Sequence, residues 1–377
     1  MSGHLKGQRV AIIGGGIAGV TAATACAQRG ARVTVHEKAP ALTEVGAGLQ
    51  VTPNGACVLR ALGVDHAPGG IAAEAVVPTC ALSGAALAQF DLGQRPYHFL
   101  HRADLLSALE AAAQSAGVAL QLGARILDPS DLDADIILGA DGLHSALRAR
   151  LNGAERPFFT GQVAWRAILH RSHPPVARVW MAPGRHVVTY PLRGGRTNIV
   201  AVQERSDWAA EGWYHRDAPA HLRAAFADCA PDLRAVLAEV TETFLWGLFR
   251  HPIAPSWGTR HMALLGDAAH PTLPFLAQGA NLALEDAWSV AAHFDALPRK
   301  QAVKAYQAAR VPRVTRAIAA ANANARNYHL SGAKRVVAHT GLRVLDRLAP
   351  RLMPSRLDWL YDYDVTEDAP TPPSKAR

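Results

Sequence analysis

The first forty residues combine two apolar strands, an Ala-rich helix and a cluster of glycines, and this combination constrains the fold more than any other feature. Residues 9–13 read RVAII, the run GGGIAGV leads into a helix that ends at Gly30, and ARVTVHE follows. Two hydrophobic strands separated by one helix are typical of a βαβ unit with parallel strands. The pattern therefore predicts an α/β fold that begins with a Rossmann-like domain.

Three glycines occupy the turn between the first strand and the helix, at the spacing Gly14-x-Gly16-x-x-Gly19. Gly14 permits the tight turn, Gly16 lets backbone amides approach a pyrophosphate, and Gly19 lets the helix pack closely on the strand. Glu37 ends the second strand, where a carboxylate accepts hydrogen bonds from a ribose hydroxyl. We expect a bound dinucleotide at this turn, and the motif alone does not distinguish FAD from NAD.

Composition narrows the class of protein. The chain has 377 residues, 49% of them hydrophobic and 19% charged, which is enough for a large core in two packed domains. The net charge is +8, but Lys and Arg are scattered without interleaved aromatics, so we expect no nucleic-acid partner. No apolar run reaches the ~20 residues of a membrane span. The four cysteines lie far apart and fit free thiols in a reducing compartment, so we expect a cytoplasmic protein, as a monomer or homodimer.

Apolar periodicity predicts the elements that follow. Helices are expected at 52–62, within 98–117, at 278–297 and at 300–328, with a more helical segment at 218–237. Residues 161–202 contain PPV, PGR and RGGR turns between short apolar runs, which is typical of an antiparallel sheet. Buried strands are expected at 133–138 and 260–265.

Two later motifs follow these buried strands. Asp141 and Gly142 stand in GADGLHSALR, where an Asp-Gly pair by itself indicates a turn. Asp267 stands in LLGDAAHPTLPFLAQGANLALEDA, at the carboxyl edge of the predicted sheet, where open α/β folds bind ligands. Pro271 and Pro274 stiffen the loop after it, and the helix that follows points its positive end toward the same edge.

The three motifs, in this order and spacing, resemble the FAD-dependent aromatic hydroxylases, the group A flavoprotein monooxygenases with the para-hydroxybenzoate hydroxylase fold. The resemblance covers residues 14 to about 364 and is strongest to the salicylate hydroxylase branch. That branch is similar in VGAGLQVTPNG, LHRADLL, VAWRA, TYPLRGG, PFLAQGANLALEDAW and LDWLYDYDV. It implies a discontinuous FAD-binding domain of the GR2 type at 1–75, 98–160 and 255–330. A substrate-binding sheet domain takes 76–97 and 161–254, and a C-terminal helical segment with a disordered tail takes 331–377.

The resemblance also implies roles for the motif residues. Gly14, Gly16, Gly19 and Glu37 bind the ADP half of FAD; Arg102 meets its pyrophosphate; Asp141 and Gly142 form a motif associated with FAD and NAD(P)H; Asp267 holds the ribityl chain; Pro274 borders the flavin ring; and the amides of Gly279, Ala280 and Asn281 face its N1/O2 edge. This implication overrides the plain turn expected for Asp141 and Gly142.

The implied reaction is hydroxylation of a small phenolic, carboxylated aromatic substrate with NAD(P)H and O2, through a flavin C4a-hydroperoxide. FAD is tightly but non-covalently bound, and NAD(P)H binds transiently, so no second glycine motif is needed. Three candidate catalytic residues follow. Gln278 stands where this branch places a substrate-side polar group, and Tyr190 stands on a strand that should face the pocket. His186 would substitute for the His that relatives often carry where this chain has Thr189. Arg166 and Arg185 are candidate partners for a substrate carboxylate, although arginines on strands are usually solvated.

Other interpretations remain at this point. A flavoprotein oxidase or reductase of the same fold would bind FAD without oxygenating a ring. A non-catalytic dinucleotide-binding protein is a further alternative, against which Asp267 and the loop from Pro274 to Asn281 argue. No residue pairing predicts a metal site.

Overall fold

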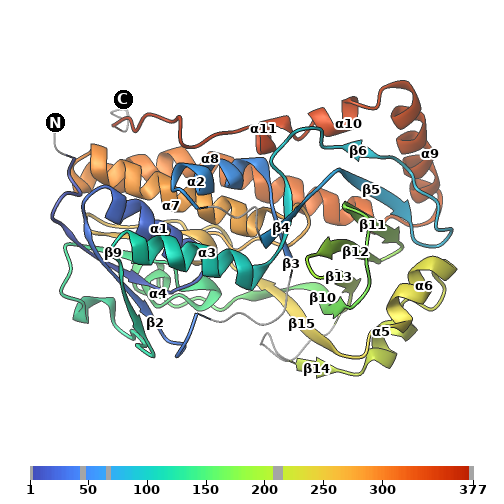
Figure 1. The fold of residues 1–377 in the computed structure, drawn as a ribbon, viewed down its shortest axis with the longest axis horizontal. Coiled ribbons are helices and arrows are strands. Elements are labelled where there is room, and N and C mark those ends of the chain that lie inside the picture. Colours follow the sequence, from blue (N-terminus) through green and yellow to red (C-terminus); the bar gives the residue numbers. More distant parts are fainter. Residues whose placement is uncertain (1–2, 43–47, 65–68, 207–214, 373–377) are drawn as a thin grey trace.

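The structure of the chain is a computed structural model, which describes residues 3–42, 48–64, 69–206 and 215–372. A five-stranded parallel sheet and a larger mixed sheet lie side by side (Figure 1). The parallel sheet has the order β16 (Met262–Leu264), β9 (Ile136–Gly139), β1 (Arg9–Ile13), β2 (Arg32–Glu37) and β8 (Ala119–Leu122). The predicted α/β fold is confirmed.

The buried strand residues and the glycines of the N-terminal βαβ unit explain why this unit forms. Residues 10–13 of β1 are buried, as expected for an inner strand of a parallel sheet. Helix α1 (Ile17–Gln28) ends before Gly30, which has a φ of +86° that favours glycine. A Cβ at Gly19 would lie 1.9 Å from the carbonyl oxygen of Gly14, so the close packing of helix and strand requires glycine there.

The larger sheet has eight strands and two different faces. Its order is β14 (His215–Asp217), β15 (Thr243–Arg250), β10 (Phe158–Leu169), β13 (Arg196–Glu204), β12 (Arg185–Leu192), β11 (Val176–Ala182), β5 (Ala75–Cys80) and β6 (Phe90–Asp91). One face packs Trp165, Val187 and their same-face neighbours against α5 (Pro219–Ala225) and α6 (Pro231–Ala238). Because side chains alternate along a strand, the intervening residues face the other way, toward the parallel sheet.

Helices complete the structure. Helix α7 (Gln278–Ala296) packs on α1 and on α2 (Pro53–Ala61), and α8 (Arg299–Tyr328) covers α7 (Figure 1). The remaining helices are α3 (Arg102–Ser115), α4 (Ala146–Asn152), α9 (Gly332–Leu348), α10 (Leu352–Ser355) and α11 (Asp358–Tyr361). The predicted helices are confirmed, and none of those described is long and apolar enough to cross a membrane.

A small sheet was not predicted from the sequence. It joins β3 (Gly48–Val51), β7 (His98–His101) and β4 (Gly70–Ala72) in antiparallel register. Its strands are three or four residues long, too short for a clear alternation. At the C-terminus, 370–372 lack regular structure, and the rest of the tail that was expected to be disordered lies outside the described residues.

Candidate active site

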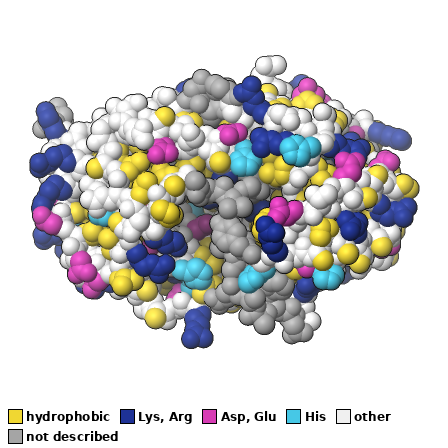
Figure 2. Space-filling view, turned by 60° about the horizontal axis from the view of Figure 1, so that its bottom comes forward, with side chains coloured by type: hydrophobic (Ala, Val, Ile, Leu, Met, Phe, Trp, Pro, Cys, Tyr) yellow, Lys and Arg dark blue, Asp and Glu magenta, His cyan; other side chains and the backbone are white. Residues whose placement is uncertain are grey.

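A cleft of about 580 Å³ lies between the carboxyl end of the parallel sheet and the free face of the eight-stranded sheet. Gly14, Gly16 and Glu37 line one end, and Arg166 and Tyr190 line the other. Its volume falls within the usual range for small-molecule and cofactor sites. On the face shown in Figure 2, the Lys and Arg side chains of the described residues are dispersed among acidic and apolar ones.

The glycine turn leaves room for a cofactor. Gly14 has a φ of +105°, and a Cβ there would lie 2.4 Å from the carbonyl oxygen of Ala140. A Cβ at Gly16 would meet no neighbouring atom of the described residues within 4 Å, although this residue caps α1. Glu37 accepts hydrogen bonds from the amides of Gly15 (2.7 Å) and Ala39 (2.8 Å), and it lines the cleft. Open space at a helix N-terminus is where a pyrophosphate fits.

Gly16→Ala and Gly19→Ala should separate cofactor binding from folding. At Gly16 the new methyl group enters the open cleft, so we expect thermal stability without FAD to stay unchanged and FAD retention to fall by at least about tenfold. At Gly19 the methyl group collides with backbone, so stability itself should fall. Differential scanning fluorimetry with and without FAD measures both effects. Equal loss of apoprotein stability in the two variants would contradict this assignment.

Asp267 follows β16 and points into the cleft. The surrounding protein raises the pKa of its carboxyl through desolvation, and the nearby charges of His270 and Arg102 oppose that rise. Arg102, at the start of α3, lines the same part of the cleft. A carboxylate and a guanidinium therefore lie together where a hydroxyl-bearing chain and a pyrophosphate would need them.

The loop before α7 and the start of that helix divide the residues predicted to contact flavin or substrate into two groups. Pro274, Gly279 and Ala280 line the cleft. The side chains of Gln278 and Asn281 are 2% and 0% exposed and lie outside its lining. Gln278 Nε2 donates to Thr52 Oγ1 (3.1 Å), and Asn281 Oδ1 accepts from the amide of Thr52 (3.0 Å). Both side chains thus connect α7 to the start of α2, and Gln278 does not reach the substrate end.

The Asp-Gly motif lies at the opposite wall of the cleft. Asp141 Oδ2 accepts from the amide of Ala146 (2.7 Å), while Oδ1 is buried and has no hydrogen-bond partner within the described chain. Desolvation raises the pKa of this carboxyl. Gly142 has a φ of +75°, so the motif is a turn that also lines the cleft. A buried acceptor without a partner suits a donor supplied by a ligand.

The free face of the eight-stranded sheet forms the substrate end. His186, Val188 and Tyr190 alternate along β12 and all line the cleft, together with Arg166 from β10 and Trp246 from β15. The Arg166 guanidinium lies 4.3 Å from the centre of the Trp246 ring, and its Nε is buried with no hydrogen-bond partner in the residues that the structure describes. Burial lowers the pKa of Arg166 to about 10, so it stays protonated at neutral pH.

The two arginines that the sequence could not rank occupy different environments. Arg166 faces the cleft, whereas Arg185 faces the other side of the sheet and forms an ion pair with Asp228. Tyr190 is buried and stacks on Phe99 with 5.2 Å between ring centres. Burial raises its pKa, so its phenol is neutral and can donate a hydrogen bond.

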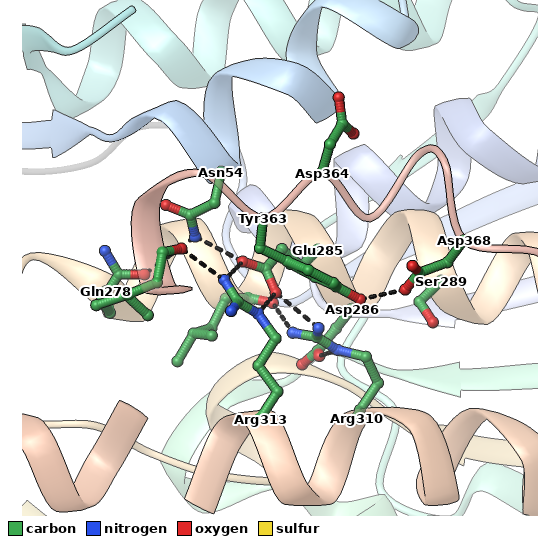
Figure 3. A network of polar contacts seen from close by, with 12 residues as sticks. Asn54, Gln278, Glu285, Asp286, Ser289, Arg310, Arg313, Tyr363, Asp364 and Asp368 are labelled. Atoms are coloured by element: carbon green, nitrogen blue, oxygen red, sulfur yellow. Dashed lines mark hydrogen bonds and ion pairs between the residues drawn. The ribbon is translucent and has the colours of Figure 1, made fainter. Parts of the chain in front are cut away.

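A buried ionic network joins α7 to α8 (Figure 3). Glu285 and Asp286 in α7 pair with Arg310 in α8 at 2.6 and 2.7 Å, and Arg313 holds Glu285 through two hydrogen bonds of 2.7 Å. Asp286 also accepts from the amide of Gly266 (3.0 Å), directly before Asp267. The network therefore connects α8 to the loop that presents Asp267 to the cleft.

Among the described residues, no group of three or more His, Cys, Asp and Glu side chains is arranged to hold a metal ion.

The sequence analysis did not identify two residues beside the cleft, His329 and Glu204. His329 contacts His186, and Glu204 contacts His329. His329 lies 143 positions from His186, and no local pattern predicts such a contact.

Comparisons with known proteins agree with this arrangement. The sequence matches the family described as FAD binding domain over residues 8–321. It is 34% identical to 3-amino-4-hydroxybenzoate 2-monooxygenase from Streptomyces cremeus, covering 97% of this chain and 98% of that one. It is 30% identical to 3-hydroxybenzoate 6-hydroxylase from Polaromonas naphthalenivorans, covering 94% and 96%.

A solved structure shares the fold. A salicylate hydroxylase substrate complex aligns with a TM-score of 0.83 at 22% identity, covering 98% of this chain and 100% of that one. The resemblance seen in the sequence motifs is thus confirmed at the level of the family. The chain belongs to the FAD-dependent aromatic hydroxylases, and it is a flavoprotein monooxygenase.

Proposed function

We propose that the chain hydroxylates a small aromatic ring that carries both a phenolic hydroxyl and a carboxylate. Arg166 is the observation that carries this proposal: a half-buried cation at the substrate end, with a buried Nε that has no partner in the described chain. A largely desolvated charge of this kind is stable when an anionic ligand can pair with it. The relatives named above act, by their names, on hydroxybenzoates, which have this combination of groups.

The protein's part at the cofactor end is to bind and orient. The redox chemistry, hydride acceptance from NAD(P)H and activation of O2, belongs to bound FAD. Gly14, Gly16 and Glu37 would hold its ADP half, and Arg102 its pyrophosphate. Asp267 would accept from the ribityl hydroxyls, with Pro274, Gly279 and Ala280 at the ring and Asp141 and Gly142 at the opposite wall.

The protein's part at the substrate end is to hold the ring and remove a proton. Val188, Val200 and Leu248 make this wall of the cleft apolar, which excludes water from the reacting atoms. Arg166 would hold the carboxylate of the substrate, and the phenol of Tyr190 would donate a hydrogen bond to an oxygen substituent of the substrate ring. His186 would accept the phenolic proton; burial lowers its pKa well below the usual value, so the imidazole is unprotonated before the substrate binds.

The proposal is tested by measuring NADH and NADPH oxidation with the FAD-loaded protein across hydroxybenzoates, aminohydroxybenzoates and hydroxypyridine carboxylates. Product mass and H2O2 are quantified together. Oxidation stimulated by a carboxylated phenol, with a product heavier by one oxygen atom, supports the proposal. Stimulation by phenols that lack a carboxylate, but not by their carboxylated analogues, would contradict it.

Asp267→Asn should weaken FAD retention by about tenfold while the fold stays intact. The change keeps the size of the side chain and removes the charged acceptor, and charge-assisted hydrogen bonds are about twice as strong as neutral ones. Flavin released on gel filtration, measured by absorbance, gives the occupancy. Asp295→Asn, a carboxylate outside the lining of the cleft, is the control and should retain FAD normally.

We further propose that the protein works in the cytoplasm as a monomer or homodimer. All four cysteines are free and buried, which suits a reducing compartment. Size-exclusion chromatography with light scattering tests the oligomeric state, and a larger assembly would contradict it.

A further inference from the structure

Three side chains form a continuous hydrogen-bonded path from the cleft to the surface. His186 lines the cleft, and its Nδ1 lies 2.7 Å from Nε2 of His329, which follows α8. The Nδ1 of His329 lies 2.7 Å from Oε1 of Glu204, at the end of β13. The His186 and His329 side chains are buried, whereas the Glu204 side chain is 54% exposed. One end of the path thus meets the substrate space and the other meets solvent.

The exposed carboxylate fixes where the protons of both imidazoles lie. An ionised Glu204 can only accept, so His329 donates to it through Nδ1. The Nε2 of neutral His329 then carries a lone pair and accepts from Nδ1–H of His186. This leaves the Nε2 of His186 without a proton. For two neutral imidazoles beside an ionised Glu204, the orientation of the path therefore leaves Nε2 of His186 able to accept a proton.

We propose that His186, His329 and Glu204 form a proton relay that carries the substrate's phenolic proton from the cleft to solvent. The inference rests on the proposed hydroxylase function. The substrate O–H bond breaks as an N–H bond forms at Nε2 of His186. The Nδ1 proton of His186 passes to Nε2 of His329, and the Nδ1 proton of His329 passes to Glu204 and then to water. His329 and Glu204 are positioning residues, since neither lines the cleft.

The surroundings of His186 leave few other routes for the proton. Phe275 and Tyr328 pack against its ring with centres 5.4 and 5.2 Å away. Burial raises the pKa of Tyr328 to about 12, so it is neutral. The neighbours in register on the adjacent strands, Met181 and Val202, are apolar. Within the described chain, His329 is thus the group that faces Nδ1 of His186 and can exchange a proton.

The two imidazoles stay neutral at rest, as the relay requires. Burial lowers the pKa of His186, and the neighbouring His329 lowers it further. Burial also lowers the pKa of His329, while Glu204 opposes that change through its charge and hydrogen bond. Without Glu204, His329 loses the acceptor that orients it, and the Nδ1 proton of His186 loses its defined destination.

Glu204→Gln is the central test, because its site is exposed and the change should not disturb folding. Glu239→Gln is the matched control: Glu239 is similarly exposed, lies beside the same sheet and pairs with Arg171. We measure, on FAD-loaded protein from pH 6 to 10, the dissociation constant of a carboxylated phenol and the rate of product formation. For Glu204→Gln we expect an unchanged dissociation constant and at least about a tenfold lower rate at neutral pH. The rate should recover above the pKa of the substrate, where the phenolate forms without a base.

His329→Ala with added imidazole gives a second measurement that a purely structural role would not change. The exogenous base can occupy the space left by the ring, so we expect imidazole to restore product formation several-fold in this variant and not in Glu204→Gln. If the native protein forms product but Glu204→Gln keeps the native rate and pH profile, the relay is wrong and the hydroxylase function stands. If the native protein hydroxylates no phenolic substrate, the proposed function fails and the relay fails with it.

Discussion

Arg166→Met should raise the dissociation constant of a carboxylated phenol by about 100-fold. Removing one partner of a buried, hydrogen-bonded charge pair costs about 2–5 kcal/mol, and every 1.4 kcal/mol is a factor of ten in affinity. Methionine preserves most of the volume and the apolar contact with Trp246. The measurement is a titration of the flavin absorbance with substrate and with its analogue lacking the carboxylate. Binding of the uncharged analogue should hardly change.

The effect is expected to be specific to the carboxylate because the protein desolvates Arg166 without giving its Nε a partner. That Nε is buried without a hydrogen bond in the described chain, and the guanidinium lies over the Trp246 ring. A cation–π contact offsets part of the desolvation and leaves the guanidinium edge available. A planar carboxylate can bind that edge through two parallel hydrogen bonds.

Arg185→Met supplies the control for this prediction. Arg185 lies on the same sheet, but it is not among the residues that line the cleft, and it pairs with Asp228, whose side chain is 63% exposed. Because this pair lies outside the cleft, substrate affinity should remain within about twofold of the native value. If the two arginine variants bind the carboxylated phenol equally well, the assignment of Arg166 as the carboxylate partner is wrong.

The features that could be predicted from sequence are those set by near neighbours. The order of strand, glycine turn and helix around Gly14 to Gly19 depends on turn geometry and on a close approach between residues five apart. The position of Asp267 at the carboxyl edge of the parallel sheet could be predicted because the residue follows a short buried strand. All strands of a parallel sheet end at the same edge, and Asp267 lines the cleft there. In both cases local sequence determines which way the residue faces.

The features that sequence reasoning missed depend on pairing between distant elements. Arg166 and Arg185 both lie on strands whose side chains alternate between the two faces of the sheet. Only the packing of α5 and α6 on one face decides which arginine lines the cleft. Gln278 begins a correctly predicted helix, but the rotation of that helix is set by Thr52 and Asn54 of a distant segment. The Gln278 side chain can therefore point away from the site that the start of its helix approaches.

Arg310→Met should destabilise the whole protein, by about 3–5 kcal/mol, because it leaves two buried carboxylates without their shared cation. Glu285, Asp286 and Arg310 are all fully buried and lie at the interface of α7 and α8 (Figure 3). The midpoint of thermal unfolding should fall by about 5 °C or more. Arg316→Met is the control on the same helix: Arg316 is exposed over the Trp359 ring, and its loss should have a much smaller effect.

The same network predicts how stability depends on pH. His270 and Arg310 lower the pKa of Asp286 to about 2 against the opposing effect of burial. A carboxyl with a lower pKa in the folded state stabilises the fold above its unfolded pKa of about 3.9 and loses that contribution as the pH falls from there toward 2. Arg310→Met removes a charge that holds the pKa of Asp286 down, so acid unfolding should begin at a higher pH. Urea unfolding midpoints from pH 7 to 3 measure this, and parallel curves for Arg310→Met and Arg316→Met would show that the buried pair does not set the acid limit.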